Sequence, residues 1–368
     1  MRIEHLRQRL ADLGAKPVHV QRMLRAWTHA LPLDAGPSRR GPALPAGVVA
    51  ALPALEAELA ELARVRDEHP GEDGSARLLV QLGDRQTVES VLLPRDGLCV
   101  SSQVGCAVGC VFCMTGRDGL LRQVGSAEIV AQVVLARARR PVKKVVFMGM
   151  GEPAHNLDNV LEAIQLLGNE GGIGHKNLVF STVGDPRVFE RLPQGPVKPA
   201  LALSLHTSRA DLRTELLPKA PRIDPRDLVE LGEAYARSTG YPIQYQWTLL
   251  DGINDTPEEL DGIVRLLTGK YAIMNMIPYN TIPDLPYRRP AHAEACERRE
   301  LTAELTAAAV ARLGRGSGRF HRAHHAQLVR ISSPQLRTDV GHRCTGGTLH
   351  GSSGLKVLKH SSERVRAI

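Results

Sequence analysis

Residues 98–113 read LCVSSQVGCAVGCVFC, and this stretch decides how the rest of the chain is interpreted. Three of its cysteines, Cys106, Cys110 and Cys113, lie within eight residues of one another. Such a cluster, outside a disulfide-rich secreted domain, is typical of metal binding or catalysis. The spacing places three thiolates on one tight loop. Three protein ligands would leave one iron of a four-iron cluster open to another ligand.

An open iron can chelate the amino and carboxylate groups of S-adenosylmethionine (SAM), whose reductive cleavage yields a carbon radical. Structural zinc is the alternative, because Cys99 or a histidine could supply the fourth ligand that a closed zinc site requires. We expect one [4Fe–4S] cluster per chain, held by Cys106, Cys110 and Cys113, with SAM as the second cofactor.

From about residue 97, short apolar segments alternate with amphipathic segments of helical length. The pattern predicts strands at 98–104, 143–149, 177–182, 199–205, 243–250 and 273–278, and helices at about 126–138, 156–168, 208–217, 225–238 and 256–268. Ser126 is the expected N-cap of the first of these helices. Six such repeats predict an α/β fold with a parallel sheet, either a full or partial barrel or a doubly wound sheet. In both, active-site groups lie at the carboxyl ends of the strands.

The flanking regions differ from this core. Residues 1–75 are rich in Ala, Leu and Arg and are predicted to form a helical accessory domain, interrupted by a Pro/Gly-rich loop at 33–47. Residues 76–94 alternate apolar and polar side chains around Gly83-Asp84, which predicts a β-hairpin in a linker at 76–96. We expect the core at 97–350 and a basic, mobile tail at 351–368.

Composition and net charge limit which partners and which cellular compartment are expected. The 368 residues carry a net charge of +8 with a pI of about 9.4, which suits a polyanion such as RNA but also a basic enzyme without one. A further basic stretch, RLGRGSGRFHRAHH at 312–325, is a candidate RNA contact or a solvated loop. With no apolar run of membrane-spanning length and an amphipathic N-terminus, we expect a cytoplasmic protein that does not enter the membrane.

Several motifs carry a family resemblance. They are residues 99–133 (CVSSQVGCAVGCVFCMTGRDGLLRQVGSAEIVAQV), 147–164 (FMGMGEPAHNLDNVLEAI), 180–184 (FSTVG), 201–218 (LALSLHTSRADLRTELLP), 249–260 (LLDGINDTPEEL) and 276–280 (MIPYN). In this order they resemble the RlmN/Cfr family of radical SAM RNA methyltransferases, over about residues 76–290. The resemblance implies a partial (β/α)-barrel and methylation of an adenosine ring carbon, C2 in preference to C8. The implied substrate is 23S ribosomal RNA, with transfer RNA as the alternative. An electron donor such as flavodoxin and a monomeric state are expected as well.

The resemblance also implies a SAM site at the ends of the predicted strands. Its residues are Gly151, Glu152, Ser181, Ser204, Leu205, His206 and Asn280. Glycines let the backbone approach a ligand, and the Glu152 carboxylate can accept the SAM amino group. Taken one at a time, these residues could equally be turn or cap residues, and His206 a buried imidazole without a catalytic role.

Adenine ring carbons are poor nucleophiles. The radical mechanism that the family resemblance implies therefore requires two further cysteines and a base. Cys344 corresponds to the cysteine that is methylated, Cys99 to the cysteine that releases the RNA adduct by closing a disulfide, and Glu89 to the proton acceptor. The sequence after Cys344 reads Thr-Gly-Gly where the family usually has Gly-Gln-Leu. Cys296 is the competing candidate, but its helical, Glu/Arg-rich context indicates a structural or incidental cysteine.

Two other functions stay open at this point. One is a radical SAM enzyme that acts on another substrate without a methyl-cysteine. The other is a non-catalytic RNA-binding relative that keeps the cluster as structure.

Overall fold

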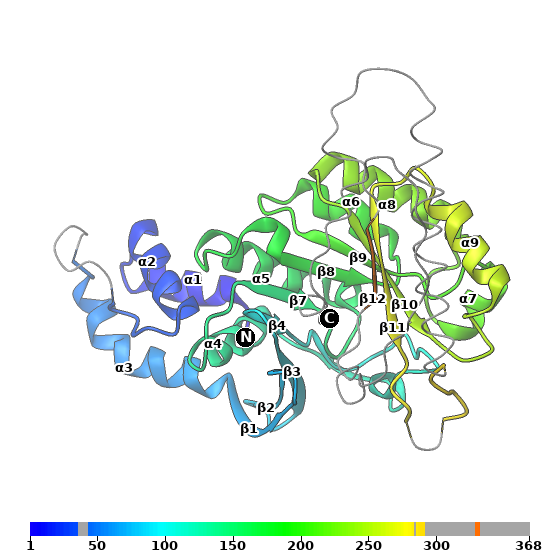
Figure 1. Cartoon of the computed structure of the whole chain (residues 1–368). Helices are drawn as coiled ribbons and strands as arrows, with labels where there is room; N and C mark the ends of the chain where they lie inside the picture. Colours follow the sequence, from blue (N-terminus) through cyan, green and yellow to red (C-terminus); the bar gives the residue numbers. More distant parts are fainter. Residues whose placement is uncertain (36–42, 283–284, 291–327, 332–368) are drawn as a thin grey trace, which may run out of the picture.

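The computed structural model describes residues 1–35, 43–282, 285–290 and 328–331 (Figure 1). Its main feature is one sheet of ten strands in the order β1-β2-β3-β4-β7-β8-β9-β10-β11-β12. The first four strands pair antiparallel, and every neighbouring pair from β4 onward is parallel. The bounds are β1 Ala63–Pro70, β2 Ala76–Leu82, β3 Thr87–Leu93, β4 Gly97–Cys99, β7 Lys144–Phe147, β8 Leu178–Thr182, β9 Ala200–Ser204, β10 Ile243–Leu249, β11 Ala272–Pro278 and β12 Leu328–Ile331.

Helices follow the parallel strands, which confirms the predicted α/β core. The α-helices are α1 Ile3–Asp12, α2 Pro17–Thr28, α3 Ala46–Glu61, α4 Ser126–Arg137, α5 Leu157–Asn169, α6 Pro186–Arg191, α7 Ala210–Leu216, α8 Pro225–Thr239 and α9 Pro257–Leu267. Five of the six predicted strands and all five predicted helices are present. The predicted strand at 98–104 is split into β4 and a second short strand, β5 (Gln103–Gly105), which belongs to a separate two-stranded sheet. The short α6 was not predicted. Among the described strands, no pairing joins the two sheet edges, so the barrel is partial.

Local sequence explains where several helices begin. Asp185, Asp224 and Thr256 precede α6, α8 and α9, and each side chain accepts a hydrogen bond from a backbone N–H of the first turn. In all three cases a proline follows directly, and its fixed φ suits the first helical position. The expected N-cap of α4 is wrong by one residue. Gly125 is the cap, and Glu128 accepts its N–H at 2.7 Å.

Two expectations for the N-terminal part need correction. Residues 63–70 form strand β1, not helix, because they pair along β2 and complete the sheet edge. The hairpin β2–β3 is not a separate linker either, since β3 pairs with β4 and so extends the core sheet. Tertiary pairing overrides the helical propensity of this charged segment.

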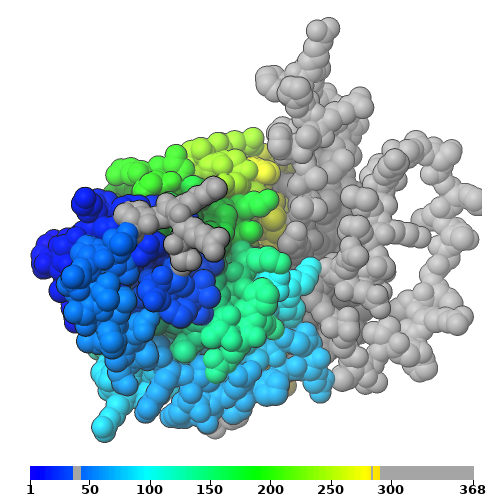
Figure 2. Space-filling model, turned by 90° about the vertical axis from the view of Figure 1, so that its left-hand side faces the viewer, coloured from blue at the N-terminus to red at the C-terminus, as the bar shows by residue number. Residues whose placement is uncertain are grey.

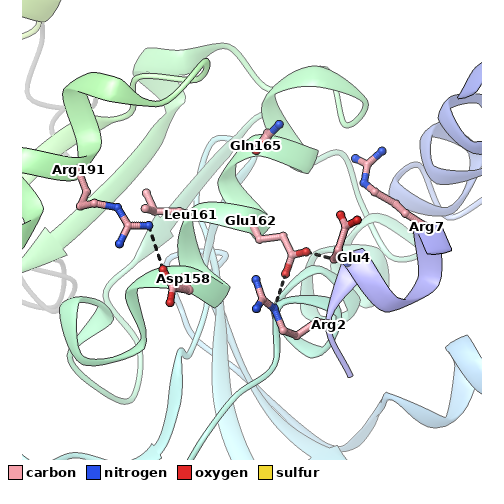
Figure 3. Close-up of a pocket in the computed structure, with 8 residues that line it drawn as sticks. All are labelled: Arg2, Glu4, Arg7, Asp158, Leu161, Glu162, Gln165 and Arg191. Carbon is pink, nitrogen blue, oxygen red and sulfur yellow. Dashed lines mark hydrogen bonds and ion pairs between the residues drawn. The ribbon is translucent and has the colours of Figure 1, made fainter.

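The N-terminal helices pack directly against the core (Figure 2). Helix α1 contacts α5 through an ion pair between Arg2, which precedes α1, and Glu162, at 3.2 Å. The pair lines a polar cavity of about 300 Å³ (Figure 3). Arg191 and Asp158 form a second ion pair there, at 2.9 Å. This cavity contains none of the predicted site residues. Within the described residues, no helix is both long and apolar enough to cross a membrane.

Alternate residues of the parallel strands point to opposite faces of the sheet. One face packs against helices in the main core, with Phe147, Phe180 and Trp247 among its largest side chains. The opposite face, which we call the inner face, is defined by a smaller buried cluster: Cys99, Val146, Val179, Ala200 and Ala202. The inner face is where a partial barrel receives its ligands.

Candidate active site

The cysteine loop lies over the carboxyl ends of the parallel strands. It connects β5 (Gln103–Gly105) to β6 (Leu120–Gln123), an antiparallel pair that is separate from the main sheet. Cys106 N–H donates to Gly119 O at 2.9 Å, and Val111 N–H donates to Leu216 O of α7 at 3.1 Å. Loop residues also pack in one cluster with Val183, Leu250 and Tyr279, which follow β8, β10 and β11.

The three loop cysteines are free and half-buried. Burial raises the pKa of Cys110, and the charges of Cys113, Cys106 and Glu152 raise it further, so the three thiols and one carboxylate lie within electrostatic reach of each other. Three thiols on one fixed loop beside a buried carboxylate fit a cluster with one open iron. Within the described residues, no three His, Cys, Asp or Glu side chains are arranged to hold a single metal ion.

Glu152 lies just after β7 and is 5% exposed. Its two carboxylate oxygens accept the N–H groups of Ala154 at 3.2 Å and Val183 at 3.1 Å. No basic side chain pairs with it in the described residues, and burial raises its pKa to about 7. A buried carboxylate without a basic partner is a suitable acceptor for a ligand ammonium group.

Gly151 can only be glycine. Its φ is +102°, and an added Cβ would lie 2.5 Å from the Gln103 Cβ. The adjacent Glu152 N–H donates to the Gln103 side chain at 2.7 Å, so β5 holds this turn in place.

His206, which follows β9, is 6% exposed and has a φ of +63°. Its Nδ1 accepts the Thr248 N–H at 3.0 Å, and its ring stacks edge-on against Phe112 of the cysteine loop, with centroids 4.9 Å apart. Burial lowers its pKa to about 3, assisted by the positive charge of Arg213. Burial therefore favours a neutral His206 imidazole, with Nδ1 as the hydrogen-bond acceptor.

The other predicted SAM residues differ in position. Ser181 and Ser204 are half-buried on the inner face, because Ser181 pairs with Ala202 and Ser204 follows Ala202 by two residues. The Leu205 side chain is fully buried in the main core, and its backbone N–H donates to Gln246 O at 3.1 Å. Asn280 is exposed, two residues beyond β11.

Cys99 and Glu89 are brought together on the inner face. Cys99 pairs with Val91 of β3, and Glu89 precedes Val91 by two residues. Cys99 is 8% exposed, and burial raises its pKa to about 12, with a further contribution from the Glu89 charge. The Glu89 side chain is 41% exposed and also bonds Arg77 at 3.3 Å across the hairpin.

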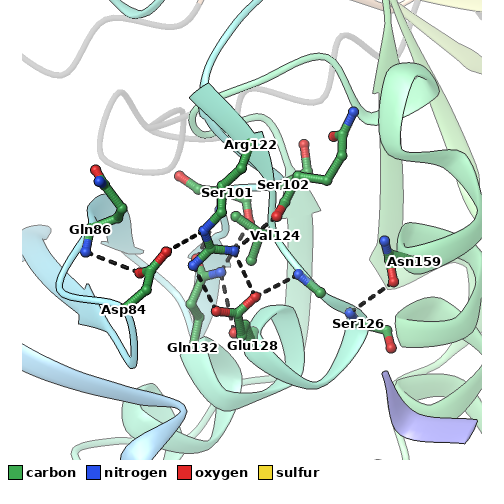
Figure 4. A network of polar contacts seen from close by, with 12 residues as sticks. Asp84, Gln86, Ser101, Ser102, Arg122, Val124, Ser126, Glu128, Gln132 and Asn159 are labelled. Atoms are coloured by element: carbon green, nitrogen blue, oxygen red, sulfur yellow. Dashed lines mark hydrogen bonds and ion pairs between the residues drawn. The ribbon is translucent and has the colours of Figure 1, made fainter. Parts of the chain in front are cut away.

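A polar network fixes the hairpin that carries Glu89 (Figure 4). Arg122 of β6 bonds Asp84 in the hairpin turn at 2.5 Å and Glu128 of α4 at 2.9 Å. Nearby, the Gln132 side-chain oxygen accepts bonds from Ser90 Oγ at 2.8 Å and from the Ser101 N–H at 2.9 Å. These contacts connect β3 and the residues after β4 to α4, and the hairpin turn to β6.

Sequence reasoning missed Arg213 of α7, which is 3% exposed. Its guanidinium donates to Val183 O at 2.5 Å and Ser204 O at 3.1 Å, across the ends of β8 and β9. Burial lowers its pKa to about 10, although the negative charges of Cys110 and Glu152 act to raise it. The only signal was its place in the quoted segment 201–218, where an arginine on a short helix looks like a surface residue.

Two buried residues hold the loop after β9, and these were missed too. Asn254 donates to His206 O at 2.7 Å, and Glu259 accepts the Ser208 N–H at 2.7 Å. Both belong to the quoted segment 249–260, whose role was not apparent from sequence. Cys344, Cys296, the basic stretch 312–325 and the tail 351–368 lie outside the described residues.

Comparisons with known proteins identify the family of this chain. Residues 100–267 match the radical SAM superfamily. A probable RNA methyltransferase of Leptothrix cholodnii is 76% identical over 291 residues, which cover 79% of this chain and 84% of the relative. One of Pseudomonas aeruginosa is 71% identical over 293 residues, covering 79% and 85%. The crystal structure of a radical SAM methyltransferase from Sphaerobacter thermophilus superposes with a TM-score of 0.71 at 28% identity, over 90% of this chain and 93% of that chain.

The partial barrel, the cysteine loop over its strand ends and the superfamily match define a radical SAM enzyme. More narrowly, the chain belongs to the family of radical SAM RNA methyltransferases represented by these relatives.

Proposed function

We propose that this protein methylates a ring carbon of adenosine in RNA, C2 in preference to C8. Ribosomal RNA is the proposed substrate, with transfer RNA as the alternative. The relatives named above are probable RNA methyltransferases, which supports RNA as the substrate class. An electron donor such as flavodoxin, a cytoplasmic location and a monomeric state belong to the same proposal.

The observation that carries the proposal is the shared position of Glu89 and Cys99 on the inner face. A methyltransferase acting on a nucleophilic nitrogen or oxygen needs neither a second cysteine nor a proton acceptor there. Methylation of a ring carbon through a methyl-cysteine needs both.

Each residue then has a role. Cys106, Cys110 and Cys113 would hold the cluster, and Glu152 would accept the SAM amino group. Gly151, Ser181, Ser204, Leu205, His206 and Asn280 would complete the SAM site. A bound cluster with SAM would supply a 5′-deoxyadenosyl radical. Cys344 would carry the methyl group, Cys99 would form the disulfide that releases the RNA, and Glu89 would accept the ring proton.

The test is an anaerobic assay of protein reconstituted with iron and sulfide, given SAM, reductant and unmodified ribosomal RNA. We expect methyladenosine in the RNA with wild type and none with Cys344→Ala, together with methyl-Cys344 in the wild-type protein. Cleavage of SAM to 5′-deoxyadenosine without RNA methylation would contradict the proposed substrate while leaving the radical chemistry intact.

A further inference from the structure

The inner face carries two amide side chains that the proposed chemistry does not use. Gln246 of β10 pairs directly in register with Asn275 of β11 and with Ser204 of β9. Side chains at paired positions of parallel strands project from the same face of the sheet. Since Ser204 is on the inner face, Gln246 and Asn275 are there as well, close to the strand ends where the SAM site is proposed.

Both amides are buried, and one of their polar atoms has no hydrogen-bond partner within the described residues. Gln246 is 5% exposed, and its Nε2 donates to Gln244 O at 3.1 Å, but its Oε1 has no partner within the described residues. Asn275 is similarly buried, at 6% exposed. A buried amide oxygen without a donor is unfavourable and rare, so a ligand donor would satisfy it.

The neighbouring strand, β9, contributes only small side chains to this part of the inner face. The inner-face residues of β9 are Ala200, Ala202 and Ser204, all of them small. In parallel barrels such positions are usually filled by Val, Ile and Leu. Small side chains beside two polar amides would not fill a hydrophobic core. Such a set of side chains suits a ligand-binding site.

We propose that Gln246 and Asn275 form a recognition site for an adenine ring. The Gln246 Oε1 accepts a hydrogen bond from the exocyclic amine, and the Asn275 amide bonds a ring nitrogen, as Asn and Gln do when they read adenine. This inference rests on the proposed function, whose reaction contains two adenines, one in SAM and one in the RNA target. The recognition chemistry is the same for both, and the experiment separates them.

The cofactor arm compares SAM with an analogue whose purine carries oxygen in place of the 6-amino group. Binding to the reconstituted protein is measured for wild type, Gln246→Leu and Asn275→Leu. Gln244→Leu is the matched control, because it changes the same residue type on the same face, two residues nearer the amino end of β10. If the amides read the cofactor, wild type binds SAM at least tenfold more tightly than the analogue. Gln246→Leu then loses this preference, Asn275→Leu binds SAM at least tenfold more weakly than wild type, and the control behaves like wild type.

The RNA arm consists of two measurements. One is the methyladenosine formed in ribosomal RNA, and the other is the cleavage of SAM in the absence of RNA. If the amides read the target, both variants bind and cleave SAM like wild type but methylate RNA at least tenfold more slowly. Unchanged binding and cleavage of SAM by both variants also shows that they are folded.

Variants that match the Gln244→Leu control in both arms would overturn the proposal. If wild type leaves the RNA unmethylated, the proposed function fails on its own account, and the cofactor arm alone then decides whether the amides read adenine. An unchanged preference for SAM in that case overturns the inference too.

Discussion

At the scale of single residues, Glu152 shows how the site is prepared for a cationic ligand. The structure buries its carboxylate among backbone N–H donors, without a basic side chain in the described residues. Burial raises its pKa to about 7 from the ordinary 4.5, because the charged form is poorly solvated. A bound ammonium group would stabilise the charged form of this carboxylate, which burial alone disfavours.

This predicts a pH dependence of stability. A folded-state pKa above the unfolded value means that the folded state holds the proton more tightly, so the stabilisation is complete below about pH 4.5 and is lost as pH rises through 7. We expect this in urea unfolding of the cluster-free protein. Between pH 5 and pH 8, the free energy of unfolding of wild type should fall by on the order of 2 kcal/mol relative to that of Glu152→Gln, which cannot ionise. Parallel stability curves for the two proteins would contradict the assignment.

At the scale of elements, the segment after β10 holds the loop after β9. Asn254 is fully buried and donates to His206 O and Thr248 O, each at 2.7 Å. It also accepts the Leu250 N–H at 2.8 Å. These bonds keep His206 in its left-handed conformation against Phe112, and so connect the β9 loop to the cysteine loop.

Asn254→Ala should therefore lower the free energy of unfolding by about 2–3 kcal/mol, because three buried backbone groups lose their partner. Asp261→Ala, at an exposed position of α9, is the control and should stay within about 0.5 kcal/mol of wild type. Chemical denaturation measures both. Equal effects of the two substitutions would show that Asn254 does not brace the loop.

The same elements show what sequence could predict. Strands such as β9, with its continuous apolar run ALALS, and helices such as α5 follow local patterns, and their positions were predicted correctly. Strand β1 was not, because its pairing with β2 is a long-range property. The positions of Asn254, Arg213 and Gln246 were hidden for the same reason: each contacts or shares a face with residues from other strands. Polar residues alternating within a strand, as in Gln244 and Gln246, were the available sign of a polar inner face.

At the scale of the whole molecule, the net charge of +8 bears on how RNA is bound. Phosphate contacts by Lys and Arg release counterions, so affinity for RNA should fall steeply with salt. We expect the dissociation constant for unmodified ribosomal RNA to rise at least about tenfold between 50 and 200 mM salt, as measured by filter binding. An affinity independent of salt would indicate that the positive charge serves another purpose.

The central claim is that Cys99 releases the RNA from a covalent adduct with Cys344. Cys99→Ala is a small change at a buried strand end and should leave the fold intact. The most direct measurement is mass spectrometry of this variant after anaerobic turnover with SAM and unmodified ribosomal RNA. The account predicts a stable protein–RNA adduct at Cys344 and no released methyladenosine, whereas wild type releases methyladenosine without an adduct. Release of methyladenosine by Cys99→Ala at the wild-type rate would contradict the account.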